Sequence, residues 1–598
     1  MSRPRQCRHF SHVARGALAL LALALTACEP PPLSGNDADV IVIGAGIAGL
    51  AAALEAESHG ARVLLIDGNS VAGGHAVMAE GIALVDTPLQ RLKGFRDAPE
   101  IAFRDFMARG EDADAWWVRA YAENSREQVY DWLTSLGVKF TALRDAPEDT
   151  VPRLHFTRAG ASHAVIPLIR AVLQRERIEL LPNTEVTGIL RRDGQIAGVR
   201  TVRTRSRGER LYRAPAVIIA TGGYQGSLAM VRSAWDETLP LPTRILIGAG
   251  AFATGGGLKL AEPFGAALGR LDHQVTVVNG LPDPRQQTAD RGLLLDNPAA
   301  IWVDSTGRRF TNEAAPGKVT TLAVLRGAPG GTHWLVFDAQ GVQQLSIRGA
   351  AWLTPQTIRS EILDNPALVK RSDSIEALAE AAGLPPDALM ETVRRFNRFV
   401  EQGMDTDFGR MGPGTSGPGP PPIRQPPFYA IQLFPMSARS LGGLVVDHEA
   451  RVLGGAGQLI RGLFAAGEVT GAAGINGRND GSGTFLGPAV MMGRIAGRGA
   501  AILALGAPQP GQPPLAASAT PEIRATGEAA AAMRRAAADL PDLLRRKRAG
   551  YWHFEVSHQL VVERDATCES CHTASWPPAP TTSREQRLAQ LESCTRCH

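Results

Sequence analysis

Two C-x-x-C-H units stand near the C-terminal end of the chain. Each is typical of a c-type haem site, in which both thiols bond covalently to the haem and the histidine binds the iron. The spacing of the four thiols would also suit structural zinc, and a disulfide is a further alternative. A histidine directly after both pairs favours haem. We therefore expect two c-type haems, held by Cys568, Cys571, His572, Cys594, Cys597 and His598.

Two more histidines, His553 and His558, precede these units, and no methionine follows Met533. With His572 and His598 they supply the four axial ligands that two bis-histidine haems require. The alternative is that His553 and His558 are surface or packing residues. Bis-histidine ligation lacks the methionine that raises a cytochrome's potential, so we expect low-potential electron carriers.

A glycine-rich turn near the N-terminus has the spacing of a dinucleotide-binding fingerprint. An apolar strand over 39–43 leads into Gly44, Gly46 and Gly49, and a second strand over 62–66 ends in Asp67. Such glycines let the backbone approach a pyrophosphate, and the acid binds ribose hydroxyls. No second fingerprint is present, since the glycines at 255–257 lack a preceding strand and a partner acid. This pattern predicts bound FAD rather than a nicotinamide dehydrogenase.

The elements that position these residues form several segments. We expect an α/β Rossmann-like FAD-binding domain with an inserted α+β capping domain, and a small, mostly irregular or helical di-haem segment. Helical patterns cover 98–137. The expected limits are 1–27 for a signal peptide, 38–240 and 428–505 for the FAD-binding domain, 241–407 for the cap, 506–549 for a linker and helix, and 550–598 for the haem module.

The first 28 residues read as an export signal. A basic start is followed by an apolar run over 16–27, which is too short to span a bilayer. It ends in Leu-Thr-Ala-Cys28, which resembles a bacterial lipobox, whose cysteine becomes lipidated. The alternative is an ordinary signal with a coincidental cysteine. We therefore expect a periplasmic protein attached to the membrane by a lipid anchor only.

Composition excludes some classes of protein. The 598 residues are 44% apolar and 20% charged, which excludes wholesale disorder. Without the four arginines of the signal, 59 basic residues face 59 acidic ones. A net charge near zero gives no electrostatic reason to expect a nucleic-acid partner.

Motifs across 39–505 resemble the flavoprotein family of fumarate reductases and succinate dehydrogenases. They include AGGH at 72–75, VIIATGGY at 217–224, RFTNE at 309–313, PPFYAI at 426–431, LGGLVVD at 441–447 and GLFAAGEVTG at 462–471. Joined to c-type haems, the chain is similar to periplasmic flavocytochromes c, although there the haem module usually comes first. The resemblance implies further FAD contacts at Gly73, Gly74, His75, Thr221, Gly222, Gly223 and Glu468.

The resemblance also implies candidate catalytic residues. Arg478 lies eleven residues after Gly467, where family members carry an arginine that binds a substrate carboxylate. A solvated loop arginine is the alternative. His273 lies close to the family's first substrate histidine, although Gln274 is the other candidate for that position. The remaining candidates are Glu313 and Arg439.

The chain departs from the fumarate-reducing pattern at several points. The segment 438–443 reads ARSLGG where fumarate reductases carry a histidine pair, and 314–317 reads AAPG where the threonine and arginine of the proton relay are expected. No arginine can be assigned as the proton donor of the cap. These differences argue against fumarate and succinate as substrates.

His75 lies six residues before Gly81, the spacing at which succinate dehydrogenases attach the flavin covalently. A covalent bond and a noncovalent packing role are both open for this residue.

The sequence predicts an enzyme in which FAD exchanges a hydride with a small molecule, a carboxylate or an enone. The haems would pass single electrons to or from a redox partner such as a cytochrome or a quinol dehydrogenase. One alternative is a dehydrogenase resembling ketosteroid desaturases, favoured by GTFLGP at 483–488. Another is a pure electron-transfer protein without a substrate.

Overall fold

The computed structural model describes residues 36–506, apart from 80, 147–148, 159–161, 205–207, 251, 287–289, 351, 416–418, 480 and 482. The predicted signal, lipobox, linker and haem module lie outside the described residues, and so do His553, His558, His572 and His598. These expectations stay predictions.

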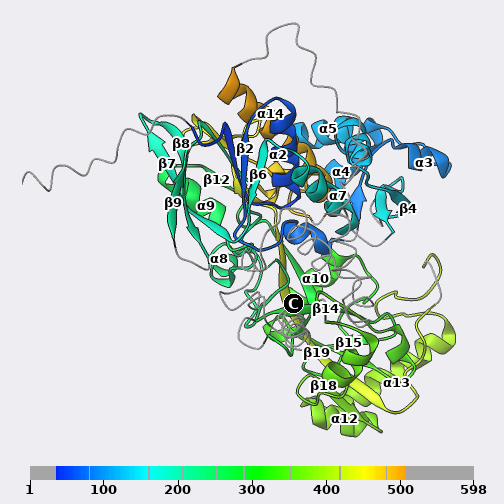
Figure 1. Cartoon of the computed structure of the whole chain (residues 1–598). Helices are drawn as coiled ribbons and strands as arrows, with labels where there is room; N and C mark the ends of the chain where they lie inside the picture. The colour runs from blue at the N-terminus through cyan, green and yellow to red at the C-terminus, as the bar shows by residue number, and fades with distance from the viewer. Residues whose placement is uncertain are drawn as a thin grey trace, which may run out of the picture. The chain divides into compact units, whose positions relative to one another are not determined.

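A six-stranded sheet forms the centre of the part that carries the fingerprint (Figure 1). Its strand order is β21-β22-β10-β1-β2-β6, and all neighbours run parallel except β21, which is antiparallel to β22. Strands β1, β2 and β10 are buried at every residue, as expected of a parallel sheet that is covered on both faces. The strands are β1 (Val40–Ile43), β2 (Val63–Ile66), β6 (Ile178–Leu181), β10 (Ala216–Ile219), β21 (Arg451–Leu453) and β22 (Leu459–Ala465).

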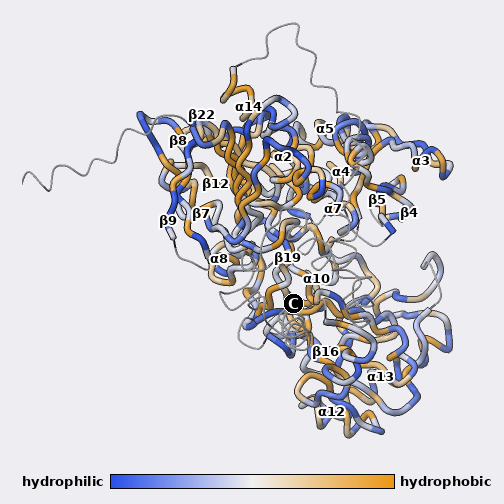
Figure 2. The backbone as a smooth tube through the Cα atoms, viewed as in Figure 1, coloured by the Kyte–Doolittle hydropathy of each residue, from blue (hydrophilic) through white to orange (hydrophobic). Residues whose placement is uncertain are grey.

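Three helices cover one face of this sheet: α2 (Ile47–Ser58), α7 (Ser162–Leu173) and α14 (Leu486–Leu505). Helix α14 is long and apolar enough to cross a membrane by length and composition. It packs closely on α2 at Gly493 and Gly497. A Cβ at either position would collide with backbone carbonyls of that helix. This close packing is what a core helix requires, and Figure 2 shows the sheet and α14 as a continuous hydrophobic region.

The other face of the sheet packs against a three-stranded antiparallel sheet of β7 (Thr184–Arg192), β8 (Gln195–Arg203) and β9 (Glu209–Tyr212). The helical pattern expected over 98–137 forms α4 (Pro99–Gly110), α5 (Ala115–Asn124), a π-helical segment (Ser125–Asp131) and α6 (Trp132–Ser135). A second small sheet consists of β3 (Ile82–Ala83), β5 (Leu154–Thr157) and β4 (Phe140–Arg144).

An eight-stranded, mostly antiparallel sheet forms a second body, which we call the cap. Its main path is β15-β16-β19-β13-β14-β17, and β11 and β18 also pair with β19. The strands are β11 (Leu246–Ile247), β13 (Gln274–Pro282), β14 (Gly292–Asp296), β15 (Ile301–Val303), β16 (His333–Phe337), β17 (Ser346–Arg348), β18 (Val369–Ser372) and β19 (Phe428–Ser440). Helices α12 (Ile375–Ala382) and α13 (Pro386–Gln402) contribute to one of its cores, and α10 (Gly317–Gly327) packs beside β13.

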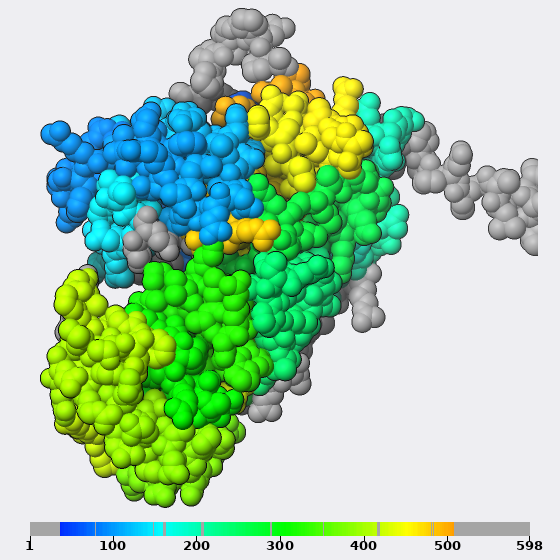
Figure 3. Space-filling model, turned by 180° about the vertical axis from the view of Figure 1, so that it is seen from behind, coloured from blue at the N-terminus to red at the C-terminus, as the bar shows by residue number. Residues whose placement is uncertain are grey.

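Strand β19 departs from the expected division of the chain. We expected residues 428–505 to form the second part of the FAD-binding domain, yet β19 pairs with β11, β13, β16 and β18 of the cap sheet. The chain returns to the six-stranded sheet only at β21 and β22. The reason is that β19 is 13 residues long and provides the central pairing surface of the cap. Seen from behind, the surface is hollowed between the blue helical region and the green cap (Figure 3).

Candidate active site

The fingerprint turn has the local geometry that a pyrophosphate requires. Gly44 adopts a φ of 101°, which residues other than glycine rarely adopt. A Cβ there would also collide with the carbonyl of Ala220. A Cβ on Gly49 would collide with the carbonyl of Gly44. Gly46 differs, because a Cβ there would meet nothing within 4 Å. It is the N-cap of α2 and makes no side-chain cap, so the first N–H groups of the helix face open space where an anion can bind.

Asp67 follows β2 and lies beside this turn. Its carboxylate accepts hydrogen bonds from the backbone N–H of Ala45 at 2.6 Å and of Asn69 at 2.7 Å. Burial raises the pKa of Asp67, although both hydrogen bonds oppose that shift. The carboxylate is therefore held next to the glycine turn, as the binding of ribose hydroxyls requires.

The loop that contains Gly73 and Gly74 packs directly on the fingerprint turn. The N–H of Gly73 donates to the carbonyl of Ala45 at 2.8 Å, and Gly46 and Gly73 form a parallel bridge. A Cβ on Gly74 would lie 3.1 Å from the Cα of Gly46. Two glycine-rich segments therefore form one surface without side chains.

A third glycine-containing segment follows β10. Gly222 leaves open space around a Cβ position, whereas a Cβ on Gly223 would lie 2.7 Å from Glu468 Oε1. Glu468 accepts hydrogen bonds from Ser440, at 3.0 Å from N–H and 3.3 Å from Oγ. Burial raises the pKa of this carboxyl. Thr221 Oγ1 is buried without a hydrogen-bond partner among the described residues.

These segments meet because β1, β10 and β22 are parallel neighbours, with Ile43 beside Ile219 and Ile219 beside Ala465. Their carboxyl ends bring together an uncapped helix N-terminus, a carboxylate beside it, open glycine positions and an unpartnered hydroxyl. This set of groups fits a flavin dinucleotide, whose pyrophosphate, ribose and ribityl hydroxyls need such partners.

The charges of two arginines act on His75. Burial and the charges of Arg439 and Arg291 lower its pKa to about 4, so the imidazole is neutral near pH 7. The Arg439 guanidinium lies 4.6 Å from the centre of the Phe485 ring. Arg291 donates to the carbonyl of Ala249, next to Gly250, whose Cβ position would lie 3.4 Å from the Cβ of His75. His75 and Arg439 are thus close enough to influence each other electrostatically.

Arg478 is surrounded by carboxylates. It donates to Asp272 Oδ2 at 3.0 Å and to Asp236 Oδ2 at 3.3 Å, and its Nε lies 3.6 Å from Asp112 Oδ2. The side chain is 42% exposed. The arginine expected to bind a substrate carboxylate is therefore already paired with three aspartates of the chain.

His273 is buried, and both of its ring nitrogens face carboxylates. Nε2 lies 2.8 Å from Asp112 Oδ2 and Nδ1 lies 2.9 Å from Asp272 Oδ1. The structure therefore brings His273 and Arg478 together through shared aspartates. Gln274 does not join this cluster: its Nε2 donates to the carbonyls of Val231 and Ala234.

Glu313 belongs to a buried ionic network of the cap. It forms a bidentate pair with Arg309 at 2.8 Å for both bonds and lies 3.2 Å from Arg410. Arg309 also pairs with Asp405 at 2.9 Å. The side chain of Glu313 is 3% exposed and accepts a further hydrogen bond from the N–H of Trp302.

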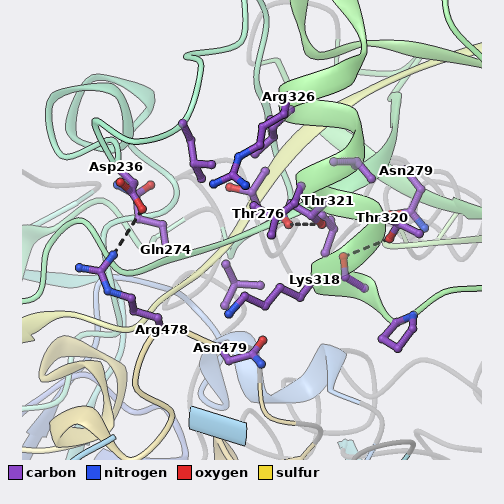
Figure 4. Close-up of a pocket in the computed structure, with 18 of the residues that line it drawn as sticks. Asp236, Gln274, Thr276, Asn279, Lys318, Thr320, Thr321, Arg326, Arg478 and Asn479 are labelled. Atoms are coloured by element: carbon purple, nitrogen blue, oxygen red, sulfur yellow. Dashed lines mark hydrogen bonds and ion pairs between the residues drawn. The ribbon is translucent and has the colours of Figure 1, made fainter. Parts of the chain in front are cut away.

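His273, Glu313 and Arg478 all line one cavity of about 690 Å³ between β13, α10 and the loops around Asp236 and Arg478 (Figure 4). The lining of this cavity does not include Arg439, which lies on the side of the predicted FAD site near His75 and Glu468. The sequence did not indicate Asp112, Asp236 and Asp272 as members of the site. They come from separate loops, and only the position of Asp272 next to His273 could have pointed to one of them.

Comparison with known proteins places the chain in a family. A family model described as an FAD binding domain matches residues 39–486. The cytochrome-type fumarate reductase of Shewanella frigidimarina is 31% identical over 473 residues, which is 77% of each chain. A KsdD-like steroid dehydrogenase of Mycobacterium tuberculosis is 29% identical over 78% of this chain and 96% of its own. The open conformation of a flavocytochrome c3 fumarate reductase superposes with a TM-score of 0.65 at 28% identity, over 82% of this chain and 81% of that one.

The glycine surface, the uncapped helix and the carboxylates define an FAD-binding flavoprotein. The chain belongs to the family of FAD-dependent oxidoreductases that contains the fumarate reductase flavoproteins. The expected α/β FAD-binding fold and the expected family resemblance are confirmed.

Proposed function

We propose that this oxidoreductase is an extracytoplasmic flavocytochrome. It reduces an activated C=C bond of a small organic substrate, or carries out the reverse desaturation, and exchanges electrons through two c-type haems. One observation carries this proposal. The same chain contains a region that matches the FAD binding domain, residues 39–486, and two C-x-x-C-H units that follow it. A cytochrome-type fumarate reductase among the relatives supports the same combination.

FAD supplies hydride exchange on one side and single-electron exchange with the haems on the other. The chain would hold it with the fingerprint turn, Asp67, the loop of Gly73 and Gly74, and Glu468. Arg439 places a cation beside the neutral His75, on the flavin side and outside the lining of the cavity, and suits the role of polarising the end of a substrate that reaches the flavin. His273 and Arg478 order the polar end of the cavity through their shared aspartates.

The carboxylate of Glu313 is occupied by ion pairs with Arg309 and Arg410. In this arrangement it does not serve as a step in a proton relay. We propose that it positions Arg309 and Arg410 in the wall of the cavity. Glu313 is therefore not assigned as the proton donor.

A second candidate function is a dehydrogenase similar to the ketosteroid desaturases that donates electrons to the haems. It is favoured by the KsdD-like relative, which matches over 96% of its own length, and by the position of GTFLGP at the start of α14, where Phe485 lies under Arg439. A non-catalytic relay of flavin and haem is the third candidate, favoured by the involvement of Glu313 in ion pairs and by AAPG at 314–317.

We further propose a periplasmic location with a lipid on Cys28 as the membrane attachment, and a cytochrome or quinol dehydrogenase as the redox partner. The near-zero net charge of the chain without its predicted signal gives no support to a nucleic-acid partner.

The proposal is tested on the purified full chain. Pyridine haemochrome and acid-released flavin measurements should give two haems for each FAD, whereas zinc in place of haem would exclude the haem module. Protein reduced with a dye is then offered a panel of unsaturated acids and enones under anaerobic conditions. An enzyme reoxidises its haem bands with at least one member of the panel, and a relay exchanges electrons only with a cytochrome.

A further inference from the structure

The 690 Å³ cavity is large for a four-carbon diacid. Its volume lies in the range of pockets that hold drug-sized molecules. Apolar side chains from both bodies contribute to its wall: Trp235, Leu239, Leu294, Trp302 and Leu325. In Figure 4, Asp236, Gln274 and Arg478 lie on one side of the cavity, and α10 presents Lys318, Thr320 and Thr321 on the other.

The cations of the cavity wall are mostly neutralised by the chain itself. Arg478 is paired with the three aspartates described above. Arg348 donates to Asp296 at 2.6 Å, and Lys318 of α10 pairs with Glu111. A dicarboxylate needs at least two available cations, and here it would have to displace carboxylates that already hold them. Like charges at close range oppose such binding.

One buried acceptor in the cavity wall has no donor. Gln274 Nε2 donates to the carbonyls of Val231 at 3.1 Å and Ala234 at 2.7 Å, which fixes the orientation of the amide, because a flip would place its oxygen against those carbonyls. Gln274 Oε1 is then buried without a hydrogen-bond partner among the described residues. A buried acceptor of this kind costs stability until a donor reaches it.

One cation of the wall is available. Arg326 of α10 lines the cavity and has no hydrogen-bond or ion-pair partner within the part of the chain that the structure describes. Figure 4 shows its side chain extending from α10 over the cavity. A single guanidinium can bind one carbonyl or one anionic group of a ligand.

From these observations we propose that the cavity binds an amphipathic substrate larger than a four-carbon acid. The substrate has an apolar body, a hydroxyl or N–H donor for Gln274 Oε1, and at most one anionic group, which Arg326 binds. C4 dicarboxylates are excluded as good substrates. This substrate class rests on the proposed reduction or desaturation of an activated C=C bond.

The test uses the holoprotein and three probes: 4-hydroxybenzylideneacetone, its 4-methoxy ether and fumarate. The first two carry the same activated C=C bond, and only the first has a donor. Binding is followed by the change in flavin absorbance, and turnover by reoxidation of the haem bands. We expect the phenol to exceed the ether at least tenfold in kcat/KM or in affinity, and fumarate to be the weakest. Equal values for phenol and ether, or fumarate as the best probe, would overturn the proposed substrate class.

Two variants locate the effect. In Gln274→Leu the preference for phenol over ether should disappear, whereas Arg326→Met, which leaves Gln274 in place, should retain it. FAD content and thermal melting are measured for both, so that unfolding is not mistaken for lost selectivity. An unchanged preference in a folded, flavin-loaded Gln274→Leu variant would contradict the proposed role of Gln274. Binding of the phenol without turnover of any unsaturated probe would refute the proposed function while leaving the ligand class of the cavity supported.

Discussion

Arg478 and His273 are joined by two carboxylates. Asp272 accepts from Arg478 at 3.0 Å and faces His273 Nδ1 at 2.9 Å, while Asp112 faces His273 Nε2 at 2.8 Å and lies 3.6 Å from Arg478 Nε. Burial alone would raise the pKa of both carboxyls, but the hydrogen bonds with His273 and the nearby arginine charges outweigh it and lower both pKa values. Asp112 and Asp272 therefore stay ionised to a lower pH than ordinary aspartates do.

Arg478→Met should affect stability more than turnover. Since the charge of Arg478 is already matched by aspartates, we expect kcat/KM for an enone to fall less than about tenfold, or ~1.4 kcal/mol. The melting temperature at pH 7 should fall, because three carboxylates lose their shared cation. The comparison variant is Arg326→Met, which should raise the KM for the enone more than Arg478→Met does. A loss of about a hundredfold at unchanged melting temperature would instead show that Arg478 binds a substrate carboxylate directly.

Gly46→Val should abolish flavin loading without unfolding the protein. The structure leaves open space at the Cβ of Gly46, so the side chain meets no part of the chain and occupies the pyrophosphate position. Gly188→Val is the matched control, because its Cβ position on β7 is equally open and lies outside the predicted FAD site. Flavin content and circular dichroism are measured for both. Normal flavin content in Gly46→Val would show that the turn does not hold the cofactor.

His333→Phe should stabilise the protein in acid. His333 is fully buried, its ring centre lies 4.4 Å from that of the tilted Trp302 ring, and neither ring nitrogen has a hydrogen-bond partner among the described residues. Burial lowers its pKa to about 3. The unfolded chain takes up a proton near pH 6.5 and the folded chain only near pH 3, so stability falls as the pH drops through this range.

Replacing His333 with phenylalanine removes both this acid loss and two unsatisfied nitrogens, for a gain of about 1 kcal/mol at pH 7. Urea unfolding at pH 7 and pH 5 measures both effects. His333→Leu tests the same change with a smaller side chain, and the exposed His163→Phe is the control. A larger loss between pH 7 and pH 5 in His333→Phe than in the wild type would contradict the expected effect.

Acid denaturation should release all of the flavin from the polypeptide. His75 is partly buried, and the nearby charges of Arg439 and Arg291 help to lower its pKa, a cationic setting that suits a noncovalent contact. Precipitation with trichloroacetic acid followed by fluorescence of the supernatant and the pellet makes this measurement. A covalent bond would be established if the flavin stayed in the pellet of the wild type but appeared in the supernatant of His75→Asn.

Cys28→Ser should release the protein from the membrane fraction, since it removes the thiol that would carry the lipid. Cys7→Ser is the matched control, because Cys7 lies within the predicted signal and should leave membrane attachment unchanged. Immunoblots of fractionated cells provide the measurement. Retention of both variants on the membrane would refute the lipid anchor.

The FAD-binding part was predictable because its signals are local. Gly44, Gly46 and Gly49 lie within one turn, and the strand that follows ends in Asp67, so sequence spacing alone determines their geometry. The polar end of the cavity was not predictable in this way. Arg478 meets Asp112 and Asp236 only after more than 240 residues of chain have folded between them, and no sequence pattern links these loops. The same is true of β19, because its sequence does not indicate which sheet the strand joins.

Strand β19 also has a structural consequence. Its first residues pair with β16 and β18 within the cap, and its last residue, Ser440, donates to Glu468 beside the predicted flavin. Arg439 and Ser440 therefore belong to the same strand that the cap sheet holds at its other end. One strand thus ties the pairing of the cap sheet to the backbone donor that holds the buried carboxyl of Glu468.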